Sequence, residues 1–89
     1  MLTHSTYTAM DTGHQMDILG KAGMWLAERG KAGKYHLYYA LADFFVEVQL
    51  VWKPEAGMNV LTFTRADARF DELLEALPLD IGQLVDPTA

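Results

Sequence analysis

Apolar and polar side chains alternate most regularly in the middle of the chain, over residues 44–53. One face of an extended chain takes Phe44, Val46, Val48, Leu50 and Trp52. The opposite face takes Phe45, Glu47, Gln49, Val51 and Lys53. Alternation with period two, in residues rich in β-branched and aromatic side chains, is typical of a half-buried strand. We therefore predict that residues 44–53 form the central strand of a small sheet.

Two shorter apolar stretches, residues 35–39 and 58–64, flank this strand and complete a three-stranded antiparallel meander. Pro54 followed by Gly57 suits a four-residue turn, and residues 40–43 are predicted to form a second loop of that length. With these loops, Tyr39 pairs with Phe44 and Lys53 pairs with Met58.

Helical periodicity appears on both sides of the predicted sheet. Thr12 and Gln15 match a capping box, and the apolar spacing after them predicts a helix over residues 13–29, ended by Gly30. A second stripe predicts a helix over residues 65–77, through Phe70, Leu73, Leu74 and Leu77. A short helical turn is expected over residues 80–84.

These elements predict an α+β fold in which both helices pack on one face of the sheet. Residues 1–11 are expected to be a flexible segment that is partly disordered or draped on the domain. Residues 12–85 form the single domain, and residues 86–89 form a tail.

Composition limits the possible functions of this 89-residue chain. Its make-up, 51% hydrophobic and 21% charged, is that of one globular domain. Twelve acids against seven bases give a net charge of −5, which argues against nucleic-acid binding in general. No cysteine is present for disulfides or thiolate metal sites. No apolar run approaches a membrane span, so a soluble cytoplasmic protein is expected.

His36 and Glu47 are the best candidate polar pair. With the predicted register they face each other across a hairpin, and a carboxylate beside an imidazole could serve as a general acid/base pair. The structural alternative is a cross-strand polar pair on a sheet surface. No nucleophile or oxyanion donor is evident near them in the sequence, which favours the structural alternative.

Residues 30–34, Gly-Lys-Ala-Gly-Lys, contain a possible anion site at Lys31 and Lys34. They lack the Ser or Thr and the spacing of a phosphate-binding loop, so a connector with two solvated lysines is the simpler interpretation. His4, His14 and His36 are scattered at spacings that do not suit metal binding. We expect neither a metal nor a cofactor.

The outer sheet face is the candidate interaction surface. In the predicted register it carries four large apolar side chains, from Tyr38, Phe45, Val51 and Val60. Monomers seldom leave so contiguous an apolar patch in water, although scattered exposed apolar residues are normal. A second copy of the chain, the N-terminal segment or a different partner could cover it.

The predicted α-β-β-β-α order resembles that of the double-stranded-RNA-binding domain. That family reads RNA through a basic start of its last helix and through the loop between its first two strands. The matching helix start here offers Arg65 and Arg69 with Asp67 between them, and no lysine cluster follows. The loop at residues 40–43 departs from the family's loop, so the likeness is one of topology and carries no function.

Residues 30–38 together with residues 44–48 resemble a segment of small bacterial single-domain proteins. This resemblance implies a bacterial source and no particular activity.

The sequence predicts a domain that acts by protein interaction rather than by catalysis. It would form a homodimer or dock to another protein through its outer sheet face. An alternative is a small-molecule-binding protein or minor enzyme with a pocket near His36, Tyr38 and Glu47. RNA binding through the last helix is the third hypothesis.

Overall fold

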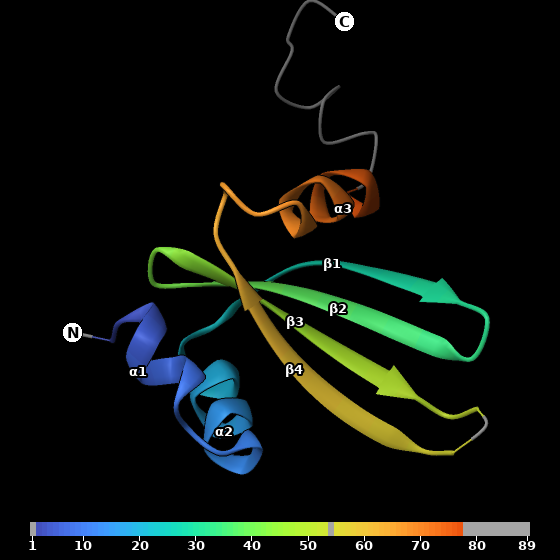
Figure 1. The fold of residues 1–89 in the computed structure, drawn as a ribbon, viewed down its shortest axis with the longest axis horizontal. Coiled ribbons are helices and arrows are strands. Elements are labelled where there is room, and N and C mark those ends of the chain that lie inside the picture. Colours follow the sequence, from blue (N-terminus) through green and yellow to red (C-terminus); the bar gives the residue numbers. More distant parts are fainter. Residues whose placement is uncertain (1, 54, 78–89) are drawn as a thin grey trace, which may run out of the picture.

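A four-stranded antiparallel sheet lies between helices on its two faces (Figure 1). The computed structural model describes residues 2–53 and 55–77. In chain order the elements are α1 (His4–Thr8), α2 (Thr12–Ala22), β1 (Met24–Lys31), β2 (Lys34–Leu41), β3 (Phe44–Val51), β4 (Gly57–Phe63) and α3 (Arg69–Ala76). The predicted α+β class and the antiparallel meander are confirmed, but the sheet has four strands rather than three.

The additional strand, β1, occupies residues that the sequence predicts to be the second half of a helix. Helix α2 ends at Ala22, and Gly23 already has an extended backbone, with φ −75° and ψ 145°. A Cβ atom on Gly23 would lie 2.6 Å from the Leu19 carbonyl oxygen. Only glycine therefore lets the chain turn away from the helix while its backbone stays this close to Leu19. The apolar spacing continues past this point through Trp25, which is why periodicity alone predicts a longer helix.

The turn between β2 and β3 has two residues instead of the predicted four. Leu41 pairs with Phe44, and Tyr39 pairs with Val46. Ala42 adopts a positive φ of 54°, a conformation that tight hairpin turns need. Glycine or asparagine usually occupies such a position, so an alanine there does not indicate a two-residue turn. The register is therefore shifted by two residues, which leaves each side chain on its predicted face.

The register between β3 and β4 is shifted by an odd number of residues, so β4 presents the opposite faces from those predicted. Lys53 does not pair with Met58; Leu50 does, and Val48 pairs with Val60. Val60 therefore lies on the same sheet face as Val48, and not on that of Val51 and Phe45.

Both faces of the sheet carry a hydrophobic core, so the prediction that both helices share one face is wrong. Against α1 and α2 lie Tyr7, Leu19, Leu41, Phe44, Val46 and Val48. Against α3 lie Ala27, Tyr38, Phe63 and Leu73. Each fully buried large side chain stabilises the fold by roughly 1.5–3 kcal/mol. Helices α1 and α2 together shield one apolar face from water, and α3 shields the other.

Helix α1 forms within the segment that is predicted to be flexible. Thr3 caps it by accepting a hydrogen bond from the Thr6 amide at 3.1 Å, and Tyr7 is completely buried. The Tyr7 hydroxyl donates to the Gln15 carbonyl at 2.8 Å, while the Gln15 amide donates back to the Tyr7 carbonyl at 2.9 Å. Residues of the N-terminal segment are thus part of the same core as the predicted domain.

The helix starts differ from the predicted ones. Asp11, and not Thr12, caps α2, by accepting from the His14 amide at 2.8 Å. Helix α3 begins at Arg69 and not at residue 65, after a turn in which Asp67 accepts from the Arg69 amide at 3.0 Å. The helical turn predicted over residues 80–84 and the tail at 86–89 lie outside the described residues. In the described part of the chain, no helix is long and apolar enough to cross a membrane.

Candidate functional site

Glu47, in the middle of β3, is a carboxylate with no exposed surface. Its Oε2 atom accepts hydrogen bonds from His36 Nδ1 at 2.8 Å and from Gln49 Nε2 at 2.7 Å. Its Oε1 atom accepts from Arg69 Nη1, at the start of α3, at 3.4 Å. An unpaired buried carboxylate costs several kcal/mol, and these three donors offset that cost.

His36 and Glu47, the pair predicted from the sequence, are in contact, although they do not sit directly opposite each other. His36 is paired with Gln49 and Tyr38 with Glu47, so the contact between the His36 and Glu47 side chains is diagonal. The bond from Nδ1 to Glu47 fixes the orientation of the ring and leaves Nε2 for another partner.

Tyr38 lies beside this pair and is 1% exposed. Burial, with smaller contributions from the charges of Glu47 and Glu72, raises the pKa of Tyr38 to about 12, and Arg29 and Arg69 oppose the shift. The hydroxyl therefore keeps its proton further into the alkaline range than an ordinary tyrosine does, and it can donate a hydrogen bond.

A hollow of about 280 Å³ opens between this part of the sheet and α3. We call it the charged hollow; the sheet lines it with Arg29, Lys31, His36 and Tyr38, and α3 lines it with Glu72 and Glu75. Arg29 Nη1 lies 3.6 Å from Glu75 Oε2, and both side chains are partly exposed. Bases on one wall thus face acids on the other.

An adjoining hollow of about 310 Å³, the basic hollow, lies at the turn between β1 and β2. It is lined by Lys31, Ala32, Lys34 and His36, so it shares Lys31 and His36 with the charged hollow. Lys31 and Lys34 are directly paired across a two-residue turn, Ala32–Gly33, in which both residues have positive φ. The predicted connector with two lysines is therefore a tight hairpin, and Gly30 lies inside β1 instead of ending a helix.

The predicted interaction surface is not a single free face. Tyr38 is buried, and the Phe45 ring packs against Phe63 at 5.5 Å and against Phe70 of α3 at 5.3 Å between ring centres. Val51 is half-buried on the same face, whereas Val60 is on the other. The prediction left this face open because it placed both helices on the opposite face. In the structure, α3 covers much of it.

Several residues around Glu47 were not predicted to belong to a site. Arg29 falls within the helix predicted over residues 13–29, and Glu72 and Glu75 lie off the apolar stripe of the helix predicted over residues 65–77. In residues 24–31 the apolar side chains all precede Glu28, so no period-two alternation indicates a strand in this stretch.

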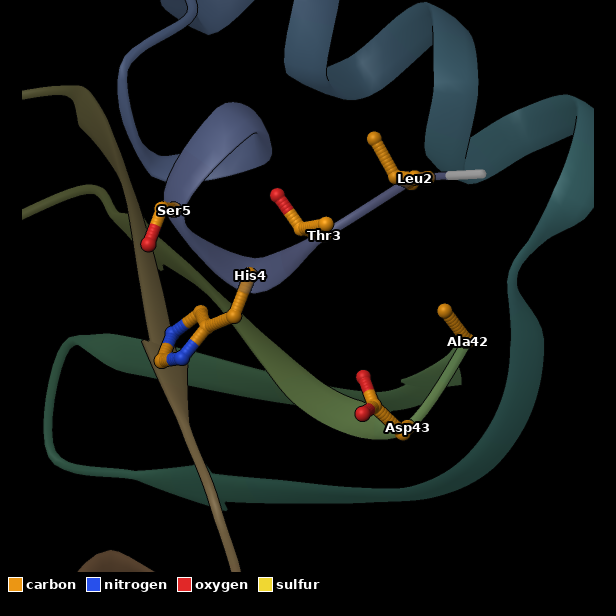
Figure 2. Close-up of a pocket in the computed structure, with 6 residues that line it drawn as sticks. All are labelled: Leu2, Thr3, His4, Ser5, Ala42 and Asp43. Atoms are coloured by element: carbon orange, nitrogen blue, oxygen red, sulfur yellow. The ribbon is translucent and has the colours of Figure 1, made fainter.

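A third hollow, of about 520 Å³, lies between α1 and the turn after β2 (Figure 2). It is lined by Leu2, Thr3, His4, Ser5, Ala42 and Asp43. Ser, His and Asp side chains are present, but among the described residues no hydrogen bond joins any two of Ser5, His4 and Asp43, and Figure 2 shows Ser5 and Asp43 on opposite sides of the hollow. His4 Nε2 is instead 2.7 Å from Thr62 Oγ1, and the His4 ring stacks on Phe44.

Within residues 2–53 and 55–77, no three His, Cys, Asp or Glu side chains are grouped so that they could hold an ion.

Replacement of Glu47 by alanine is expected to lower the free energy of unfolding by about 1–3 kcal/mol, since it leaves the mostly buried His36 without its acceptor, whereas Arg69, whose side chain is 39% exposed, can turn to water. Urea unfolding measures the loss. Glu55→Ala, in the exposed turn after β3, is the matched control and should change stability by less than about 0.5 kcal/mol. Equal small effects of the two substitutions would contradict the buried network.

Stability is expected to fall as the pH rises from about 10 to about 12, because the pKa of Tyr38 in the folded protein, about 12, exceeds its ordinary value of 10.0. In that range the unfolded chain loses the Tyr38 proton while the folded protein keeps it. Between pH 9 and about pH 12, the free energy of unfolding should therefore fall by about 2 kcal/mol less in Tyr38→Phe than in the parent, as measured by urea unfolding. Identical losses in both proteins would show that burial does not hold this proton.

Comparison of the chain with protein-family models, with curated proteins and with solved structures gives no match. No family therefore supplies an activity or a set of site residues. The case for a function rests on the geometry of Glu47, His36 and the two hollows that meet at His36.

Proposed function

We propose that this protein is a small-molecule-binding domain whose ligand presents an anionic group to His36, Lys31 and Lys34. The observation that carries the proposal is the position of His36, which a fully buried carboxylate holds at the junction of the charged and the basic hollow. A side chain held in this way loses little conformational freedom when it binds a ligand.

Positive charge is concentrated at this end of the sheet, although the chain as a whole carries −5. Arg29, Lys31 and Lys34 all belong to the hairpin of β1 and β2. Lys53 is close by, because a Cβ atom on Gly33 would lie 3.0 Å from the Lys53 Cβ atom. Four of the seven lysines and arginines thus surround one turn, which favours an anion there.

Binding fits the geometry better than catalysis does. The His36 ring has an orienting carboxylate, as in acid/base sites, but in the described part of the chain no hydroxyl nucleophile hydrogen-bonds to it. The residues around it supply charge and hydrogen-bond donors, which suffice to hold a ligand.

A thermal-shift screen tests the binding proposal. Carboxylates, phosphates and amino acids are each added at millimolar concentration, and at least one should raise the melting temperature of the parent, since a ligand of the folded state stabilises it. The double variant Lys31→Gln/Lys34→Gln should lose that response. Lys21→Gln, which removes an exposed lysine of α2, is the control and should keep it.

The binding proposal fails if no compound of the screen raises the parent's melting temperature. It also fails if the double variant responds as the parent does.

Self-association is a second proposed function, now placed on the other face of the sheet. Tyr35, Leu50 and Met58 are neighbours across β2, β3 and β4, on the face that α2 covers elsewhere. Leu50 is 37% and Met58 41% exposed, and Trp52, just after β3, is 50% exposed. A second copy of the chain is the proposed occupant, because identical apolar patches can cover each other across a two-fold axis.

The oligomeric state tests this second proposal. Sedimentation should give a dimer for the parent and a monomer for Leu50→Glu. Leu74→Glu is the matched control, because Leu74 is an even more exposed leucine, at 49%, on α3; this variant should remain dimeric. A monomeric parent would refute self-association.

A further inference from the structure

We infer that the ligand of the charged hollow is a small zwitterion, an α-amino acid or a similar ammonium carboxylate. Its carboxylate would lie against Lys31, His36 and Arg29, and its ammonium group against Glu72 and Glu75. This inference rests on the proposed binding function and specifies its ligand.

The walls of the charged hollow have opposite charge. Arg29 and Lys31 on the sheet contribute two positive charges, and Glu72 and Glu75 on α3 contribute two negative charges. Glu72 and Glu75 are three residues apart on one helix, so both can face the same hollow. A purely anionic ligand would be repelled by the helix wall, and a purely cationic one by the sheet wall.

The ion pair across the hollow can give way to such a ligand at little cost. Arg29 and Glu75 are 3.6 Å apart with side chains 37% and 70% exposed, and exposed pairs of this kind contribute little stability. A zwitterion would give Arg29 a carboxylate and Glu75 an ammonium group, so each charge would exchange one partner for another. The net charge of the hollow would not change.

The size of the hollow suits a molecule of this class. At about 30 Å³ per water molecule, a volume of 280 Å³ holds on the order of nine water-sized groups. Small amino acids have a similar number of non-hydrogen atoms. Tyr38, at the edge of the hollow, adds a neutral hydroxyl that can donate to the carboxylate or accept from the ammonium group.

Isothermal titration calorimetry with the intact chain tests this assignment. The probes are the twenty free amino acids and, for each one that binds, its N-acetyl derivative and its amide. Loss of either ligand charge should weaken binding at least tenfold. The Glu72→Gln/Glu75→Gln variant should bind the free and the N-acetylated form about equally, while Asp71→Asn, an exposed control on the same helix, should keep the parent's preference.

Two results would overturn the assignment. If an N-acetyl amino acid or a simple carboxylate binds as tightly as the free amino acid, the ligand is an anion, and the proposed binding function stands without the zwitterion. If no amino acid binds, the zwitterion is refuted, and the response of the thermal-shift screen to the other anions decides separately whether the binding function stands.

Discussion

The buried carboxylate of Glu47 connects three parts of the fold. Its two oxygen atoms accept hydrogen bonds from His36 of β2, Gln49 of β3 and Arg69 at the start of α3. A charge in an apolar layer is stable only while all of these donors are in place, so the strand register and the position of α3 depend on one another. The same bonds hold His36 where the two hollows meet. Glu47, whose burial as a charged group is unfavourable by itself, therefore also positions the candidate site.

The sheet has one end that helices cover and another end that they leave uncovered. Where helices cover both faces, the side chains are apolar and buried, as Tyr7 and Val46 are on one face and Phe63 and Leu73 on the other. The turns after β1 and after β3 extend away from α1 and α2 (Figure 1). Around these turns the α3 face is basic and polar, and the opposite face exposes Leu50 and Met58. One uncovered end of a sheet can thus present two different surfaces.

Helix α3 has two functions in this arrangement. Phe70 and Leu73 pack on the sheet and close the second core. Glu72 and Glu75 form a wall of the charged hollow, and Glu75 reaches Arg29. Without α3, the basic side chains of the β1–β2 hairpin would face solvent alone. With α3 in place, they face acidic side chains across the charged hollow.

The sequence by itself determined the α+β class, the central strand β3 and the partnership of His36 with Glu47, because period-two alternation and cross-strand pairing are local patterns. It did not determine the end of α2 at Gly23, because helical spacing continues past that residue, or the positive φ of Ala42, because alanine is not the usual residue of a tight turn. The faces of β4 depend on its register with β3. Packing against the sheet places the helices on opposite faces, buries Tyr38 and brings Arg69, Glu72 and Glu75 to the site. Which side chains share a hollow was therefore decided only by tertiary packing, which sets strand register and helix position together.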